Sequence, residues 1–173
     1  MMADIMFNLR DLPSHSTLLQ FARSYPDLDV SALESWLLLL RSASDEVAEF
    51  ENFLSEYGLS PTKFFVLILL KRNPDGLAPS RLAEGVDVSY PTMTGIVDRL
   101  ERDGVVRREE TPEDRRCVPV RLTKKGQALL DSLLPPHYAR VAQLFGGLTK
   151  TDRATLKKLL GKLRQSAKEK NDE

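Results

Sequence analysis

The sequence predicts a mainly α-helical protein with a small β-wing: a winged helix-turn-helix joined to a helical dimerisation region. Three observations predict this. Several long segments repeat their apolar residues with the 3.6-residue period of amphipathic helices. A short helix, a tight turn and a longer helix are expected between residues 78 and 103. Two strand-like runs, residues 105–109 and 118–122, then flank a turn and predict a hairpin.

The first 30 residues are expected to form an N-terminal arm rather than a domain. They are rich in apolar side chains, but Pro13 and Pro26 would interrupt any long helix. An apolar arm of this length must lie against another surface.

A long helix is predicted from Ser31 to about Tyr57. Ser31 and Glu34 have the S-x-x-E spacing of a capping box, and Gly58 is a natural stop. The apolar residues expected on one face of this helix are Leu33, Trp36, Leu37, Leu40, Ala43, Val47, Phe50, Leu54 and Tyr57.

The next helix begins at Ser60-Pro61, with serine as the cap and proline in the first turn. Residues 64–70, FFVLILL, have no polar face, so this helix is expected to be central and buried. The sequence NPDG, residues 73–76, predicts a turn.

A helix-turn-helix is predicted next. Residues 78–86 give a short helix whose inward residues are Leu82 and Ala83, and Ser89 caps a helix that runs to about Asp103. The apolar residues of the second helix are Met93, Ile96, Val97 and Leu100, which form one narrow inward stripe.

The hairpin and two further helices complete the chain. Pro119 cannot donate to a strand ladder, so its strand should be an edge or the proline should face outward. Helix is expected again from Thr123, with an interruption at Pro135-Pro136. The sequence TKTD, residues 149–152, can cap a last helix whose apolar stripe is Leu156, Leu159, Leu160, Leu163 and Ala167.

The net charge of zero hides an uneven distribution. Residues 1–60 carry three Lys or Arg and ten Asp or Glu, whereas residues 99–125 carry nine basic and six acidic side chains. Residues 126–173 carry nine basic and five acidic side chains. This asymmetry indicates either an electrostatic partner for the second half or a solvated helical surface.

Catalysis and metal binding have little support. The single cysteine, Cys117, excludes an intrachain disulfide, and nothing indicates that it meets His15 or His137. Clustered metal ligands and phosphate-binding glycine loops are absent from the sequence. We therefore expect no enzyme, no metal and no cofactor. No apolar run is long enough to span a bilayer, so we expect a cytoplasmic protein without a membrane partner.

Double-stranded DNA is the partner that the helix-turn-helix predicts. In a helix-turn-helix, the first residues of the second helix reach base edges. The polar face of the helix predicted from Ser89 continues from these residues toward its C-terminal end. The predicted contact residues on this helix are Ser89, Tyr90, Pro91, Thr92, Thr94 and Arg99. None of these is a bidentate arginine or asparagine on the first turn, so direct base readout is expected to be modest.

The hairpin tip is expected to enter the minor groove. A side chain that lies in a narrow groove must be long, slim and cationic, which describes Arg115 and Arg116, and Asp114 can hold a guanidinium in place. Arg107 and Arg108 on the first strand are candidates for phosphate contacts. Arg121, Lys124 and Lys125 are further candidates at the other end of the wing.

The segment LAPSRLAEGVDVSYPTMTGIVDRLERDGVVRREETPEDRRCVPVRLTKKG resembles the winged-helix core of the MarR family of bacterial transcription regulators. With the flanking helices, the resemblance covers roughly residues 31–168. The D-R-R motif at residues 114–116 is its most specific element, and EDRRCVPVRLTKKG…LLPPHY and the arm look most like the family's multidrug-efflux repressor branch.

The resemblance implies a homodimer that reads an inverted repeat. The arm (residues 1–30) and the helical regions (31–60 and 123–173) would form the dimer, and residues 61–122 would form the DNA-binding lobe. In the family, Arg116 is the residue expected in the minor groove, and the helix from Ser89 enters the major groove.

Three positions depart from the family pattern. Asp87 stands where the family often has glycine, and aspartate tolerates a left-handed conformation better than most residues. Ala78 replaces a capping threonine. Phe65 stands where a urate-responsive branch has an acidic residue, which argues against that class of ligand.

A small-molecule effector is also implied by the resemblance. Members of the branch accommodate lipophilic, often phenolic or weakly acidic compounds between the dimer helices and the DNA-binding lobe. Candidate lining residues are Trp36, Arg41, Tyr57, Phe64 and Phe65. Each of these residues could equally belong to the core or the dimer interface, and Arg41 could pair with Asp45 four residues on.

The sequence thus predicts a homodimeric transcriptional repressor that binds double-stranded DNA sequence-specifically and is released by a lipophilic or aromatic ligand. Two alternatives stay open. One is a redox-responsive regulator that uses the thiol of Cys117, which requires a lowered pKa and exposure. The other is a winged-helix protein-interaction module that does not bind DNA.

Overall fold

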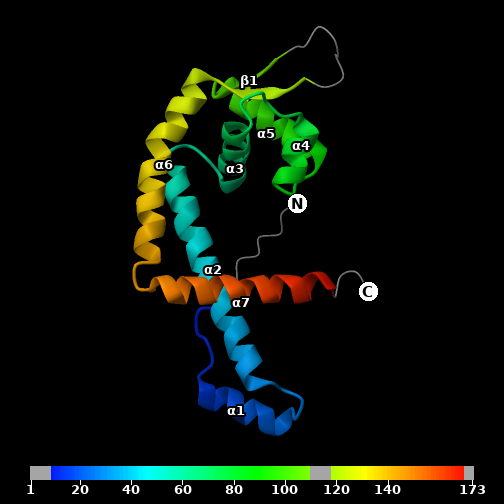
Figure 1. Ribbon diagram of the computed structural model, residues 1–173. Coiled ribbons are helices and arrows are strands. Elements are labelled where there is room, and N and C mark those ends of the chain that lie inside the picture. Colours follow the sequence, from blue (N-terminus) through cyan, green and yellow to red (C-terminus); the bar gives the residue numbers. More distant parts are fainter. Residues whose placement is uncertain (1–8, 110–117, 170–173) are drawn as a thin grey trace. The chain divides into compact units, whose positions relative to one another are not determined.

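The computed structural model describes residues 9–109 and 118–169 of the chain (Figure 1). The chain divides into two compact units, Met1–Gln127 and Ala128–Glu173. The described residues form seven helices and one two-stranded antiparallel sheet. This confirms the predicted class, a mainly α-helical protein with a small β-wing.

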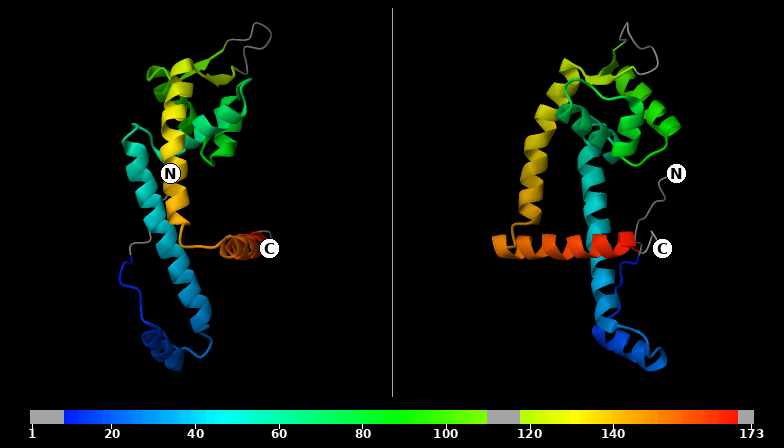
Figure 2. Two further views of the ribbon diagram at one scale, coloured as in Figure 1. Left: turned by 60° about the vertical axis from the view of Figure 1, so that its left-hand side comes forward. Right: turned by 45° about the vertical axis from the view of Figure 1, so that its right-hand side comes forward.

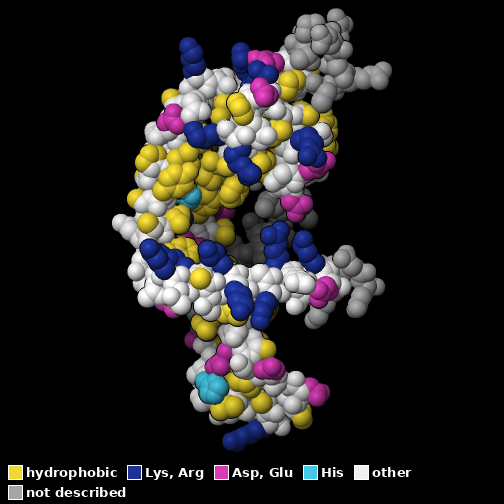
Figure 3. Space-filling model, in the orientation of Figure 1, with side chains coloured by type: hydrophobic (Ala, Val, Ile, Leu, Met, Phe, Trp, Pro, Cys, Tyr) yellow, Lys and Arg dark blue, Asp and Glu magenta, His cyan; other side chains and the backbone are white. Residues whose placement is uncertain are grey.

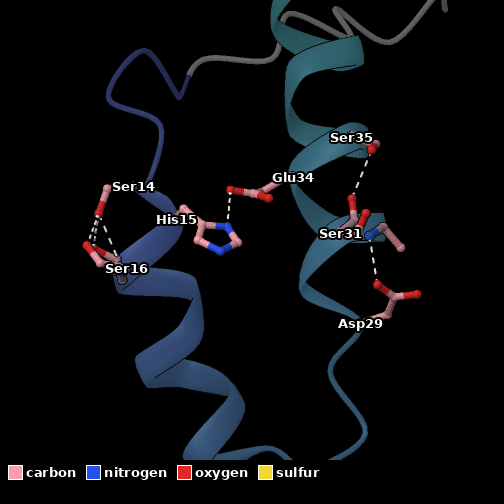
Figure 4. A network of polar contacts seen from close by, with 9 residues as sticks. Ser14, His15, Ser16, Asp29, Ser31, Glu34 and Ser35 are labelled. Atoms are coloured by element: carbon pink, nitrogen blue, oxygen red, sulfur yellow. Dashed lines mark hydrogen bonds and ion pairs between the residues drawn. The ribbon is translucent and has the colours of Figure 1, made fainter.

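Two helices open the first unit. Helix α1, His15–Ser24, lies in the predicted arm, between the two prolines, and contacts α2, Val30–Ser55. The start predicted for the second helix is wrong. Its cap is Asp29, whose Oδ1 accepts a hydrogen bond from the backbone N–H of Ala32 at 2.9 Å. Glu34 does not close a capping box, because its Oε1 lies 2.8 Å from Nδ1 of His15 in α1 (Figure 4).

The end of α2 confirms the predicted stop. Gly58 has a φ of 68°, and the N–H of Leu59 donates to the carbonyl of Leu54 at 3.1 Å. The apolar face predicted for α2 is only partly covered in the single chain. Its residues Leu37 and Leu54 are buried, but Trp36 is 53% exposed.

Helix α3, Pro61–Arg72, begins as predicted. Oγ of Ser60 accepts from the N–H of Lys63 at 3.3 Å, and Pro61 occupies the first turn. Its buried residues are Phe64, Val66, Leu67 and Leu70. Phe65 is 47% exposed, so the expectation that the whole helix is buried is wrong on this face.

The helix-turn-helix is confirmed. Helix α4, Pro79–Gly85, buries Leu82 and Ala83, and it contacts α5, Tyr90–Arg102. The turn between them contains Asp87 at a φ of 54°, which aspartate tolerates. Helix α4 has no side-chain cap at Ala78. The core residues of α5 are Met93, Val97 and Leu100.

The wing consists of β1, Val106–Arg108, and β2, Val120–Leu122. Leu77 pairs with Val120 on the other side of β2 through bonds of 3.0 and 2.8 Å. Strand β2 is therefore not an edge at Val120, which contradicts only the first of the two alternatives expected for Pro119, an edge strand or an outward-facing proline. Pro119 lies just before β2 and needs no N–H there, because only its carbonyl is used, accepting from the N–H of Glu109 at 2.9 Å.

Helix α6, Lys124–Leu144, crosses from the first unit into the second and is continuous through Pro135 and Pro136. The predicted interruption is therefore wrong. Proline fixes φ near its helical value, so the main losses are two ladder donors and some steric strain, which this helix of 21 residues absorbs.

Helix α7, Lys150–Glu169, starts with the predicted cap. Asp152 accepts from the backbone N–H and the hydroxyl of Thr149 at 2.9 and 2.6 Å, and its own N–H donates to Thr149 at 3.1 Å. None of the described residues of α7 is buried, so the stripe of leucines predicted on this helix lies open in the single chain.

None of the described helices is long and apolar enough to cross a membrane.

Candidate nucleic-acid interface

The first turn of α5 carries an exposed surface that is held in shape from within the helix. Oγ of Ser89 accepts from the N–H of Thr92 at 3.4 Å and lies 2.8 Å from its hydroxyl. The hydroxyl of Thr94 donates to the carbonyl of Tyr90 at 3.1 Å. The three predicted hydroxyls are therefore hydrogen-bonded inside the helix, whereas Tyr90 is 58% exposed and Pro91 is exposed as well.

The polar face of α5 continues beyond the first turn. Asp98, Arg99 and Arg102 are exposed, and they lie opposite the buried residues Met93 and Val97. A helix whose buried stripe is this narrow leaves more than half of its circumference for a partner.

An ion-pair cluster fixes the hairpin to this helix. The guanidinium of Arg108 in β1 donates to Asp98 at 2.6 Å and to Glu101, and the backbone N–H of Arg108 donates to Glu101 at 2.9 Å. Figure 2 shows the hairpin beside α5 in both views, and the two elements are in contact. Burial lowers the pKa of Arg108, but the hydrogen bonds to Asp98 and Glu101 outweigh it and the net shift is upward. Arg108 therefore positions the hairpin. Its ion pairs with Asp98 and Glu101 compete with the phosphate contact that the sequence predicts for Arg108.

The other basic residues of the wing have different surroundings. Arg107 forms an ion pair with Glu109 and is exposed. Arg121 lies 3.0 Å from Glu109 and donates to the carbonyl of Asp75 at 2.8 Å. Both guanidiniums lie on the surface of the hairpin. A DNA phosphate could therefore replace the carboxylate of Glu109 as their partner.

The junction with α6 locks the end of α5. The hydroxyl of Thr123 donates to the carbonyl of Gly104 at 2.7 Å, and Nζ of Lys125 donates to the carbonyl of Asp103 at 2.7 Å. Lys125 therefore neutralises the negative end of the α5 dipole.

Asp114, Arg115, Arg116 and Cys117 lie outside the described residues. The minor-groove role of the hairpin tip and the redox alternative therefore stay predictions.

Of the residues predicted to bind an effector, Phe64 and Phe65 are in contact, with ring centroids 5.3 Å apart, whereas Trp36 and Tyr57 are far from each other in the single chain. Trp36 and Tyr57 are 21 positions apart along α2 and its end, which corresponds to roughly 30 Å. Phe64 is buried against Phe50, with ring centroids 5.3 Å apart. Arg41 donates to Asp45 at 2.9 Å, so the pairing considered as an alternative is present. Hydrogen bonds with Arg41 lower the pKa of Asp45.

Phe65 lines a cavity on the surface of the described first unit. This cavity has a volume of about 440 Å³ and lies against α3 and the end of α4. Its lining residues are Pro61, Thr62, Phe65, Ile68, Leu69, Arg72, Gly85 and Val86. Sequence reasoning missed Arg72, although the i, i+3, i+4, i+7 spacing of Phe65, Ile68, Leu69 and Arg72 could have shown that they share one face.

Residues 9–109 and 118–169 contain no group of three or more His, Cys, Asp or Glu side chains that could hold a metal ion. The main features of the site are a helix-turn-helix whose second helix, α5, is exposed, and a hairpin that ion pairs hold against the side of α5. They define a winged helix-turn-helix protein of the DNA-binding class.

Comparison with known proteins identifies the family. Residues 59–118 match the sequence profile of the MarR family. The transcriptional repressor YetL of Bacillus subtilis is 32% identical over 156 residues, which cover 90% of this chain and 93% of YetL. The chain belongs to the MarR family of transcriptional regulators.

BpsR and NadR are two of the solved structures that share the fold. BpsR of Bordetella bronchiseptica, whose DNA binding is regulated by 6-hydroxynicotinic acid, has a TM-score of 0.64 at 27% identity, covering 76% of this chain and 98% of BpsR. NadR, in complex with 4-hydroxyphenylacetate, has a TM-score of 0.59 at 26% identity, covering 72% of this chain and 88% of NadR.

Proposed function

We propose that this protein is a homodimeric transcriptional repressor that binds an inverted repeat in double-stranded DNA and is released by a small aromatic ligand. The observation that carries the proposal is the exposed first turn of α5 beside a hairpin that Arg108 holds against it. A fixed angle between a helix and a hairpin lets one lobe contact the major groove and the adjacent minor groove together.

Helix α5 is the element proposed to enter the major groove. Tyr90 and Pro91 offer exposed aromatic and apolar surface to base edges, and Arg99 and Arg102 are exposed cations for phosphates. Arg115 and Arg116 are proposed to occupy the minor groove, with Asp114 orienting one guanidinium. Base specificity would then depend on shape and apolar contact more than on bidentate hydrogen bonds.

Exposed apolar surface supports a homodimer. Monomeric proteins rarely leave large contiguous apolar patches open to water. The exposed large apolar residues of α1, α2 and α7 are Leu19, Phe21, Trp36, Leu38, Leu39, Val47, Leu159, Leu160 and Leu163. We therefore assign residues 1–30, 31–60 and 123–173 to dimerisation and residues 61–122 to the DNA-binding lobe.

Charge supports the same assignment. Residues 1–60 are strongly acidic, and residues 126–173 carry nine basic against five acidic side chains. Figure 3 shows Lys and Arg side chains along α7. In a two-fold dimer, a basic helix of one protomer can face the acidic helices of its partner.

The cavity beside Phe65 is the proposed effector site. Its lining is mostly apolar, and Arg72 supplies a cation, which suits an aromatic carboxylate. BpsR and NadR, the two structural neighbours, are described with 6-hydroxynicotinic acid and 4-hydroxyphenylacetate, which are both aromatic acids. A ligand can lower DNA affinity only by binding better to a state that fits the operator poorly.

Fluorescence anisotropy on labelled duplexes tests the proposal. The duplexes carry the DNA upstream of the protein's own coding sequence, with a scrambled duplex of equal length as the control. If each half-site makes three or four phosphate contacts, the log–log slope of affinity against salt is expected to be about −5 to −7. Half-sites should lie about 10 base pairs apart. Equal binding to both duplexes, or affinity that ignores salt, would contradict the proposal.

A further inference from the structure

Gly95 lies near the middle of α5, a helix of 13 residues. Glycine in a helix interior destabilises the helix relative to alanine, because it loses more conformational freedom on folding. A glycine at this position therefore calls for a reason in the folded protein or in something that the protein binds.

Contacts with the described residues do not supply that reason. A Cβ built at Gly95 would meet no described atom within 4 Å, and Gly95 does not have the positive φ of Gly58 or Gly104. Gly85 at the end of α4 is different, because a Cβ there would lie 2.6 Å from Cδ1 of Leu69. Residues 9–109 and 118–169 leave room for the methyl group of an alanine at position 95.

Gly95 lies on the side of α5 opposite the buried residues Met93 and Val97. Pro91 lies one turn before it and Asp98 one turn after it, and both are exposed. The carboxylate of Asp98 is held by Arg108 at 2.6 Å. The hydroxyl of Thr94 is already hydrogen-bonded to the carbonyl of Tyr90. Arg99, one turn after Gly95, and Arg102, two turns after it, are exposed cations on the same face and could contact the phosphates beside this point.

We infer that Gly95 is the point at which α5 approaches DNA most closely, so that the missing side chain lets the helix backbone contact the floor of the major groove. This inference rests on the proposed function. Glycine is the residue that permits a close approach of the backbone to a ligand. Specificity at the base pairs under Gly95 then comes from steric fit, since the adjoining hydroxyl is used within the helix.

Gly95→Ala tests the inference, with Gly161→Ala as the matched control once sedimentation shows that both variants remain dimeric, because Gly161 lies in the region assigned to dimerisation. Gly161 lies in α7, and a Cβ there also meets no described atom within 4 Å. Both variants are expected to raise Tm by about 2–4 °C, because alanine favours the helix. Only Gly95→Ala is expected to weaken binding to the upstream duplex, by about tenfold or more, since an extra methyl in a close-packed contact commonly costs that much.

The outcomes separate this inference from the proposed function. If the wild-type chain does not prefer the upstream duplex, the proposed function fails and the inference fails with it. If the wild-type chain binds and Gly95→Ala binds equally well, only the inference is overturned. A lower Tm for Gly95→Ala would also overturn it, because the site would then not be open. Equal loss of binding by a Gly161→Ala variant that sedimentation shows to be dimeric would overturn it too, because the effect would not belong to α5.

Discussion

The guanidinium of Arg108 in β1 donates a hydrogen bond of 2.6 Å to Oδ1 of Asp98 in α5. Glu101, one turn further along α5, holds the same arginine through both its guanidinium and its backbone N–H. Two carboxylates on one helix therefore bind one residue of the hairpin. These ion pairs fix the angle between the two elements that we propose to contact adjacent grooves of DNA.

Arg108→Gln is expected to loosen the hairpin. The ion pairs are partly exposed, so the free energy of unfolding should fall by roughly 0.5–1 kcal/mol, measured by urea denaturation. DNA affinity should fall as well, because the hairpin must then be ordered on binding. Arg107→Gln is the neighbouring control, since Arg107 pairs with Glu109 within the hairpin. If both variants lost the same free energy of unfolding, the ion pairs between Arg108 and α5 would contribute no more than the ion pair within the hairpin.

Ser89 is expected to act as a helix cap rather than as a base-reading residue. Ser89→Ala should lower the free energy of unfolding by about 1 kcal/mol, as should Ser60→Ala at the start of α3. Ser89→Asp retains a capping oxygen, so stability should be preserved, but its negative charge should weaken DNA binding. If Ser89→Ala left stability unchanged and lowered affinity alone, a direct DNA contact would replace the capping role.

Arg116→Ala is expected to weaken operator binding by about 1–3 kcal/mol while leaving the dimer folded. The measurement is anisotropy against the upstream duplex, with sedimentation to confirm the oligomeric state. Arg23→Ala in α1 removes the same charge from an exposed position far along the sequence and serves as the control. Unchanged affinity for Arg116→Ala would refute the proposed wing contact.

Arg72→Gln is expected to reduce the response to aromatic acids. With 4-hydroxyphenylacetate as the probe, the concentration needed to release DNA should rise by about tenfold, since a charge-assisted hydrogen bond contributes roughly 1.5–3 kcal/mol. Arg41→Gln is the control, because Arg41 is held by Asp45 on α2. A larger effect of Arg41→Gln would move the effector site from the cavity on α3 to α2.

The start of α7 should be sensitive to acid. Hydrogen bonds from the side chain and then the backbone of Thr149 lower the pKa of Asp152 below its ordinary value. A carboxylate with a lowered folded-state pKa contributes stability above its unfolded pKa of about 3.9, and this contribution is lost as the pH falls through the folded value. Between pH 5 and pH 3, Asp152→Asn should therefore lose less stability than the wild-type chain. A parallel loss in both would contradict this.

Local hydrogen-bond rules explain which elements the sequence predicted well. The caps at Ser60 and at Thr149 with Asp152 involve groups within three residues of each other, so their spacing alone predicts them. The sequence does not decide the cap of α2, because Asp29 and Ser31 both suit the role and the structure uses Asp29. Glu34 is hydrogen-bonded to His15, which lies 19 positions away along the chain.

The candidate site also has features that follow from local sequence rules and features that depend on packing. The sequence by itself determined the helix-turn-helix, the exposed polar face of α5 and the presence of paired arginines in the wing, because these depend on periodicity and turn chemistry. Only the tertiary structure decided that Arg108 faces α5 while Arg107 stays on the surface, and that Arg72 joins Phe65 in a cavity. Neighbouring strand residues point to opposite faces, and which face meets a helix depends on packing between segments that are distant in the sequence.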